Sequence, residues 1–182
     1  MHEGSHDSLV RAKVKNYAQL LGLYPSRARV ASCREFPFQW PMRGLIHHLD
    51  LTVKDPWASR AFYDSVLGFM GYRLIREDAR GFDWELTRPD GGFASIGLMK
   101  AEGAGLNREH DRYAPGLHHV AWHAASRKDV DNLYLLLIEI GATVLDPPAD
   151  YPAYGDGYYA VFFSDRDGLK LEFVHLPREA DQ

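Results

Sequence analysis

The chain has 182 residues, 46% of them hydrophobic and 13% aromatic, which excludes a largely disordered chain and suffices for the core of one compact domain. The 21 Lys and Arg against 25 Asp and Glu give a net charge of −4, and the longest apolar run, residues 133–138, is too short to span a membrane, so neither nucleic acid nor a membrane is an expected partner. Cys33 is the only cysteine, which excludes an internal disulfide, predicts a reducing cytoplasmic setting and leaves nitrogen and oxygen to supply any metal ligands.

The first 43 residues are predicted to be an N-terminal extension. Residues 9–21 have the apolar spacing of an amphipathic helix, and Gly22 is a plausible stop. The segment lacks the apolar region of a secretory signal. We expect an extension, helical or partly disordered, ahead of a domain over residues 44–176.

A repeat divides this domain into two modules. Ile46-His47-His48-Leu49 recurs 71 residues later as Leu117-His118-His119-Val120, each copy in a predicted strand. The modules span residues 44–100 and 116–175, and a linker rich in Gly, Ala and charged residues joins them. We therefore expect each module to contain the same sequence of secondary structure elements.

Each His-His doublet is followed by a predicted helix. Asp55 and Pro56 predict the start of the first helix and Gly68 its end, while Ser126 and Gly141 bound the second. After each helix the apolar period changes from 3.6 to 2, which predicts three strands. The strand ranges are 72–77, 82–87 and 93–100 in the first module and 143–145, 158–164 and 169–175 in the second. The expected fold is α+β, with a βαβββ unit used twice.

Alternation along these strands separates an apolar face, which packs under the helix, from a polar face. Residues assigned to the polar face are His48, Asp50, Thr52, Glu85, His119, His123 and Glu172. The first histidine of each doublet, His47 or His118, points the other way and is excluded. A sheet with helices on one face and ionisable groups on the other predicts a concave polar surface that can form a site.

The same residues form a longer pattern. It runs from His48 to Asp55 (His-Leu-Asp-Leu-Thr-Val-Lys-Asp), through Val66-Leu67-Gly68-Phe69 and His119, to Asp165-Arg166-Asp167-Gly168 and Leu171-Glu172. The pattern resembles the vicinal oxygen chelate superfamily, which includes glyoxalase I, fosfomycin-resistance thiol transferases, bleomycin-resistance proteins and extradiol dioxygenases. The resemblance implies two modules that curl into an open, barrel-like cup with helices on its outer face.

The resemblance also implies a metal site. Its ligands fall on His48, His119 and Glu172, all on the face that alternation had already assigned as polar. This set would hold one divalent ion, Mn, Fe(II), Ni or Zn, with positions left open for substrate. The fourth ligand of glyoxalase I, a Glu or Gln, has no counterpart, because one alignment puts Ser95 there and another puts Gly97.

Further residues complete the predicted site. Asp50 and Glu85 are candidate catalytic bases, and an ordinary solvated carboxylate is the alternative for each. Residues 147–159, rich in Pro, Gly and Tyr, are predicted to be either a lid over an aromatic or polar substrate or a stiff surface loop. The predicted substrate-pocket residues are His123, Tyr154, Tyr158 and Tyr159.

These features predict a metal-dependent enzyme acting on a small oxygen-chelating substrate, by isomerase, lyase or thiol-transferase chemistry. The alternatives are a metal-free sequestering protein of the bleomycin-resistance type and a ring-cleaving dioxygenase. Phe162 argues against the dioxygenase, since those enzymes usually carry tyrosine ten residues before the Glu. The family also implies a homodimer, with modules paired within one chain or across the dimer. Across the dimer, His48 and His119 of one site would come from different subunits.

Overall fold

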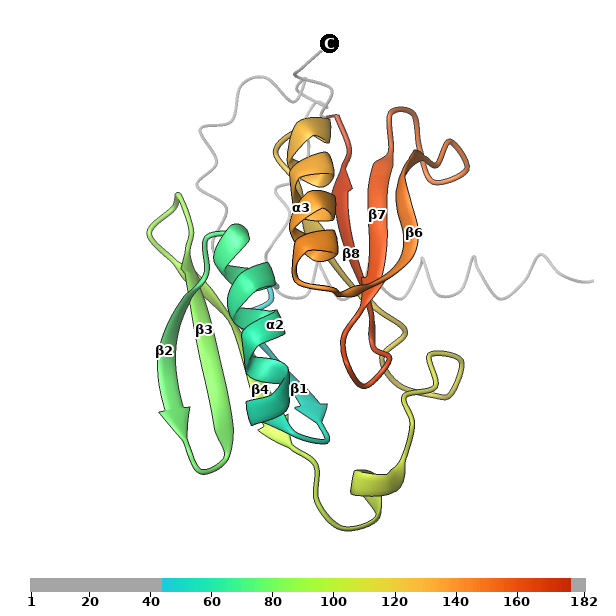
Figure 1. Ribbon diagram of the computed structural model, residues 1–182. Helices are drawn as coiled ribbons and strands as arrows, with labels where there is room; N and C mark the ends of the chain where they lie inside the picture. The colour runs from blue at the N-terminus through green and yellow to red at the C-terminus, as the bar shows by residue number, and fades with distance from the viewer. Residues whose placement is uncertain (1–43, 178–182) are drawn as a thin grey trace, which may run out of the picture. The chain divides into compact units, whose positions relative to one another are not determined.

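The computed structural model describes residues 44–177, so the predicted helix at residues 9–21 lies outside the described residues. The first module contains β1 (His48–Val53), α2 (Pro56–Phe69), β2 (Arg73–Asp78), β3 (Gly81–Thr87) and β4 (Phe93–Lys100) (Figure 1). The second contains β5 (Val120–His123), α3 (Arg127–Glu139), β6 (Thr143–Asp150), β7 (Tyr159–Ser164) and β8 (Lys170–His175). A short 3₁₀ helix, η1 (Gly103–Asn107), lies in the linker. The βαβββ unit is thus used twice, as predicted.

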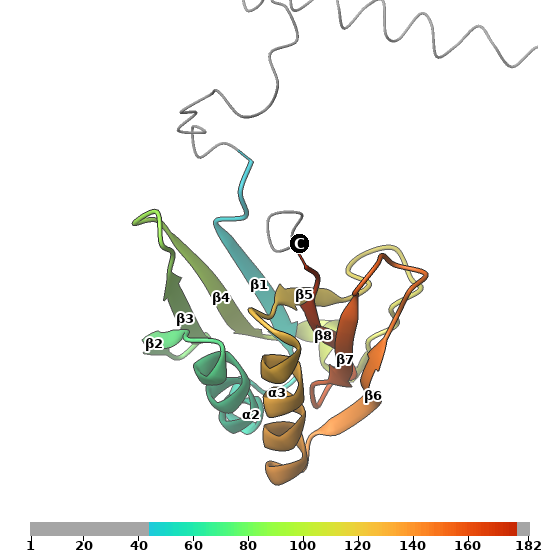
Figure 2. The same cartoon turned by 90° about the horizontal axis from the view of Figure 1, so that it is seen from above.

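The two modules have the same sheet topology. The strand orders are β1-β4-β3-β2 and β5-β8-β7-β6, and in each sheet the first strand pairs in parallel with the last while the other pairs are antiparallel. The sheets stay open and do not close into a barrel (Figure 2). The expected α+β fold with an open, cup-like arrangement is confirmed.

The predicted helix starts are confirmed by side-chain caps. The Asp55 carboxylate accepts hydrogen bonds from the backbone N–H groups of Trp57 and Ala58, and the Ser126 hydroxyl accepts one from Asp129. The end of α2 differs from the prediction. Gly68 lies inside the helix, and the left-handed residue that follows the helix is Gly71, with φ +92°. Neither α2 nor α3 has the length and apolarity that a membrane-spanning helix needs.

Strand β6 is longer than predicted, since it continues to Asp150 through Pro147 and Pro148. Proline cannot donate to a neighbouring strand, but β6 is the edge of its sheet and pairs only with β7. Its register is irregular on both sides of Asp146. The edge position explains why the proline pair does not end the strand.

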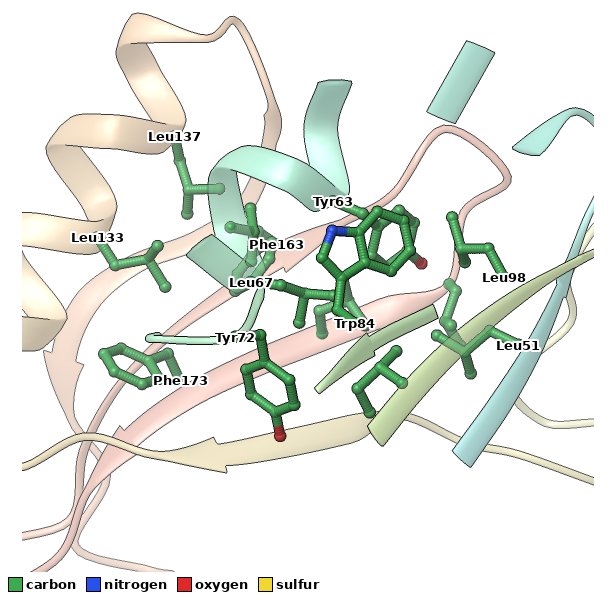
Figure 3. Packing of buried hydrophobic residues seen from close by; sticks show 14 of the residues in the cluster. Leu51, Tyr63, Leu67, Tyr72, Trp84, Leu98, Leu133, Leu137, Phe163 and Phe173 are labelled. Atoms are coloured by element: carbon green, nitrogen blue, oxygen red, sulfur yellow. The ribbon is translucent and has the colours of Figure 1, made fainter. Parts of the chain in front are cut away.

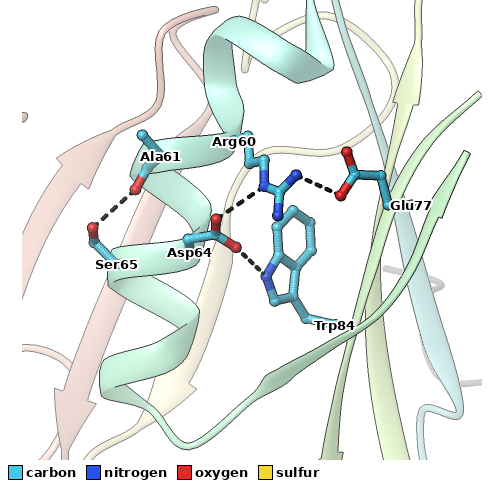
Figure 4. Close-up of polar contacts among 6 residues, drawn as sticks. All are labelled: Arg60, Ala61, Asp64, Ser65, Glu77 and Trp84. Atoms are coloured by element: carbon cyan, nitrogen blue, oxygen red, sulfur yellow. Dashed lines mark hydrogen bonds and ion pairs between the residues drawn. The ribbon is translucent and has the colours of Figure 1, made fainter.

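The polar network around Asp64 fastens α2 to its sheet (Figure 4). The Asp64 carboxylate accepts a hydrogen bond of 2.8 Å from the indole Nε1 of buried Trp84 and one of 3.1 Å from Arg60 Nε. Arg60 Nη1 also lies 2.6 Å from Glu77 Oε2 on β2. The Trp84 N–H therefore has a partner although its ring is in the core.

Both modules contribute to one hydrophobic core (Figure 3). Helices α2 and α3 contact each other in the angle between the two sheets (Figure 2). Aromatic rings meet across the modules, with centroids 6.2 Å apart for Phe62 and Phe163 and 6.0 Å apart for Phe69 and Phe173. Each helix thus covers one face of its own sheet. Because these covered faces share a core, the polar faces of the two sheets turn away from it.

Candidate metal centre

The polar face of the second module brings together two of the predicted ligands. His119 Nε2 lies 3.1 Å from Glu172 Oε2. Glu172 is in the middle of β8, in register with Ala121 on β5 and Phe162 on β7, and only 2% of it is exposed. A buried carboxylate needs charged or hydrogen-bonding partners, and His119 is one of them.

The tyrosine-rich segment supplies the second partner. The Tyr158 hydroxyl donates a short hydrogen bond to Glu172 Oε1. Burial, together with this hydrogen bond, raises the pKa of Tyr158 above its usual range, so the phenol remains a neutral donor at physiological pH. The sequence did not predict this bond, and the only signal was the density of tyrosines in residues 147–159.

The histidine before each predicted ligand contacts that ligand. His118 Nδ1 lies 2.7 Å from His119 Nδ1, and His47 Nδ1 lies 3.0 Å from His48 Nδ1. Desolvation lowers the pKa of His118, and the charge of the nearby His119 lowers it further. Both effects favour a neutral His118 ring. The His118 contact holds one nitrogen of His119, while the other nitrogen faces Glu172.

His48 does not join this cluster. It is exposed on the polar face of β1, and within residues 44–177 no group of three or more His, Cys, Asp or Glu is arranged to hold a metal. Both polar faces turn away from the shared core, but His48 belongs to the first-module sheet, whereas His119 and Glu172 belong to the second module. One chain therefore assembles His119 and Glu172 but not the full predicted set.

The strand register identifies the first-module counterpart of Glu172. Glu172 pairs with Ala121, two residues after His119, and the equivalent pair is Asp50 with Gly97. Gly97 rather than Ser95 is thus the counterpart. A Cβ at this glycine would lie 2.3 Å from Asp50 Oδ1 and 2.8 Å from Asp83 Oδ1, so both aspartate side chains would have to move to accept a carboxylate side chain there.

The two candidate bases lie on the first-module sheet, with His48. Asp50 is exposed beside Gly97, and Glu85 is half-buried on β3, in register with Ser95 on β4. Neither residue belongs to the group formed by Glu172 and its partners. Their assignment as bases stays a prediction.

The predicted pocket residues lie on both faces of the second sheet. Tyr154 is 66% exposed and stacks on Tyr151 with ring centroids 6.0 Å apart. His123 is exposed at the end of β5, in register with Val174. Tyr159 is not on the face where we expected it, because alternation at the start of β7 turns it toward α3, where its hydroxyl donates to Asp131 at 2.7 Å.

The paired βαβββ modules, with a histidine and a carboxylate on one polar face, define a protein of the vicinal oxygen chelate fold. The family profile described as "Glyoxalase/Bleomycin resistance protein/Dioxygenase superfamily" matches residues 45–173, and the chain belongs to that superfamily.

Three similar proteins extend this likeness. The uncharacterized protein YqjT of Bacillus subtilis (strain 168) is 36% identical over 129 residues, which cover 71% of this chain and 97% of YqjT. The crystal structure of a glyoxalase candidate from Bacillus halodurans is 32% identical, with a TM-score of 0.63, and the match covers 74% of this chain and 97% of that one. The structure of lactoylglutathione lyase from Agrobacterium tumefaciens shares the fold at 20% identity and a TM-score of 0.51, over 74% of this chain and 96% of that one.

Proposed function

We propose that the protein is a metal-dependent enzyme that acts on a small substrate with adjacent oxygen donors. The observation that carries the proposal is the 3.1 Å separation of His119 Nε2 and Glu172 Oε2 on a polar sheet face. A histidine nitrogen and a carboxylate oxygen are ligands that divalent transition-metal ions accept, and this pair would be able to hold the same ion.

A bound Mn, Fe(II), Ni or Zn ion would polarise a substrate oxygen and stabilise negative charge that develops on it. The residues of the chain would prepare the site for this. His118 orients the His119 ring, and Tyr158 keeps Glu172 covered on one side. Isomerase, lyase and thiol-transferase reactions all fit such a site.

We further propose that His48 reaches the site from a second copy of the chain. The support is that one chain holds His119 and Glu172 on a face turned away from the shared core, while its own His48 lies on the other sheet. In a two-fold dimer, the β1 face of one copy can meet the β8 face of the other, and the same contact occurs twice. The site would then be complete only in the dimer.

Metal content tests the proposal directly. The wild-type dimer is reconstituted with each of the four ions, desalted and analysed for bound metal. We expect one ion per chain, and a loss of stoichiometric binding in His48→Ala, His119→Ala and Glu172→Ala. A folded wild-type dimer that retains well below one ion per chain with every metal would overturn the proposal. It would favour the second candidate, a metal-free sequestering protein.

A mixing experiment tests the shared site. His48→Ala and Glu172→Ala chains are unfolded together and refolded as a mixture. With shared sites, about half of the dimers are mixed and each has one complete site out of two, so about a quarter of the wild-type metal capacity should return. Sites contained within one chain predict no recovery. Thiol-dependent loss of methylglyoxal or of an epoxide, and oxygen uptake with catechols, then separate the reaction classes.

A further inference from the structure

We infer that Tyr158 is a positioning residue that makes Glu172 a one-oxygen ligand. The inference rests on the proposed function and deepens it. Glu172 has two carboxylate oxygens with different partners. Oε1 accepts the hydrogen bond from the Tyr158 hydroxyl, while Oε2 faces His119 Nε2 at 3.1 Å.

The backbone around Tyr158 fixes where its ring lies. The Tyr158 N–H donates to the Gly155 carbonyl at 3.2 Å, and the Tyr158 carbonyl accepts from the Tyr151 N–H at 2.8 Å. Gly157 before it has φ +75°, and a Cβ there would lie 2.8 Å from Pro177. Only glycine fits this position without strain. These contacts fix the backbone at Tyr158 and so limit the positions that its hydroxyl can reach.

Apolar groups surround the Tyr158–Glu172 hydrogen bond. Ala160, Phe162 and Val174 form a second buried cluster on this face of the sheet, and the Tyr151 and Tyr158 rings pack against it. The rings of Tyr151 and Phe162 are 5.1 Å apart, edge to face. Because Glu172 is almost fully buried here, water cannot readily replace the phenol as the partner of Oε1.

The consequence concerns how many positions a bound ion would keep for substrate. A carboxylate that binds through both oxygens takes two positions, whereas one whose Oε1 is held by a phenol takes one. Tyr158 thus reserves a position for the second oxygen of a chelating substrate. Partners that orient a ligand in this way typically change metal affinity by about 10- to 100-fold when removed.

Tyr159 provides a matched control because it also donates a hydrogen bond to a carboxylate, that of Asp131, but on the opposite face of the sheet. Metal affinity is measured for wild type, Tyr158→Phe and Tyr159→Phe by competition with a chelator, and the absorption spectrum of the Co²⁺ form is recorded. We expect Tyr158→Phe to keep the wild-type stoichiometry, to bind metal about 10- to 100-fold more weakly and to show an altered Co²⁺ spectrum. Tyr159→Phe should match wild type in both measurements. Unchanged affinity and spectrum in Tyr158→Phe would overturn the inference.

A second measurement separates this inference from the proposed function. Unfolding midpoints of the metal-free protein are compared for Tyr158→Phe, Glu172→Gln and the double variant. A non-additive result supports the pairing of the two side chains even if wild type binds no metal, in which case the proposed function alone fails. Additive shifts would overturn the positioning role whether or not metal binds.

Discussion

The two sheets have the same strand order and pair their first and last strands in parallel, but their polar faces differ in chemistry. At equivalent positions the first sheet has Gly97, flanked by Asp50 and Asp83, and the second has Glu172, covered by Tyr158. In the first sheet Asp83 is held by Arg76, whose Nε and Nη2 lie 2.5 and 3.0 Å from its two oxygens. The repeat therefore preserves topology, while the ligand set is asymmetric.

The largest expected loss of stability comes from placing a glutamate at Gly97, the position in the first sheet that is equivalent to Glu172. Gly97→Glu should lower the free energy of unfolding by about 3 kcal/mol, because its Cβ meets Asp50 and Asp83 and its carboxylate adds a third negative charge beside theirs. Urea denaturation measures the loss. Ser95→Glu, on the same strand and face, is the control and should cost less than about 1 kcal/mol. Equal losses would mean that the space around Gly97 is not the reason for the asymmetry.

The next effect compares a carboxylate from each face. Metal at 100 times its dissociation constant should raise the free energy of unfolding of the wild type and of Glu85→Ala by about 2.7 kcal/mol. Glu172→Ala should gain nothing at that concentration, because it lacks a ligand. Thermal or urea unfolding with and without metal provides the test. If metal also fails to stabilise Glu85→Ala, Glu85 contributes to metal binding and the site includes the first sheet.

A smaller effect is expected at the junction of the modules, where the Tyr63 hydroxyl donates to buried Asp165 at 2.9 Å. Tyr63→Phe should cost about 1–2 kcal/mol, because the Asp165 carboxylate loses a partner. Burial raises the pKa of Tyr63 well above 10.0, so an unfolded chain ionises this phenol first. Stability should therefore fall as pH rises above 10.0, and less steeply in Tyr63→Phe. Identical pH slopes in urea denaturation would contradict this.

The smallest effect concerns the arginine that ties each helix to its sheet. Arg127 Nη1 lies 2.6 Å from Asp150 Oδ1, as Arg60 Nη1 lies 2.6 Å from Glu77 Oε2 in the first module. These ion pairs are partly exposed to solvent, so Arg127→Ala and Arg60→Ala should each lower the melting temperature less than the variants above. High salt should remove most of either difference. A large, salt-independent loss in one of them would show that the modules are fastened differently.

Local signals in the sequence were enough to predict the two βαβββ units, the capping residues Asp55 and Ser126, and the face on which His119 and Glu172 lie. These features depend on neighbours along the chain or on simple alternation. The end of α2 was misplaced because Gly68 fits a helix interior at modest cost, while Gly71 supplies the left-handed residue.

Features set by distant contacts could not be predicted from the sequence. Whether Ser95 or Gly97 is the counterpart of Glu172 can be decided only when the register of β1 with β4 is known. The face on which Tyr159 lies can be assigned only when the residue at which β7 begins is known. The separation of His48 from Glu172 follows from a core shared by both helices, and one sequence does not contain that information directly. The Tyr158 bond likewise joins residues 14 positions apart through a loop whose path alternation does not define.

The irregular strands at the far ends of the two sheets bear on how copies of the chain associate. Strand β2 has a register shift between Leu74 and Arg76, and β6 has its two prolines and two register shifts. Bulges, charges and prolines at an edge discourage the addition of strands from other molecules. Growth of a continuous intermolecular sheet is thus disfavoured at these two margins.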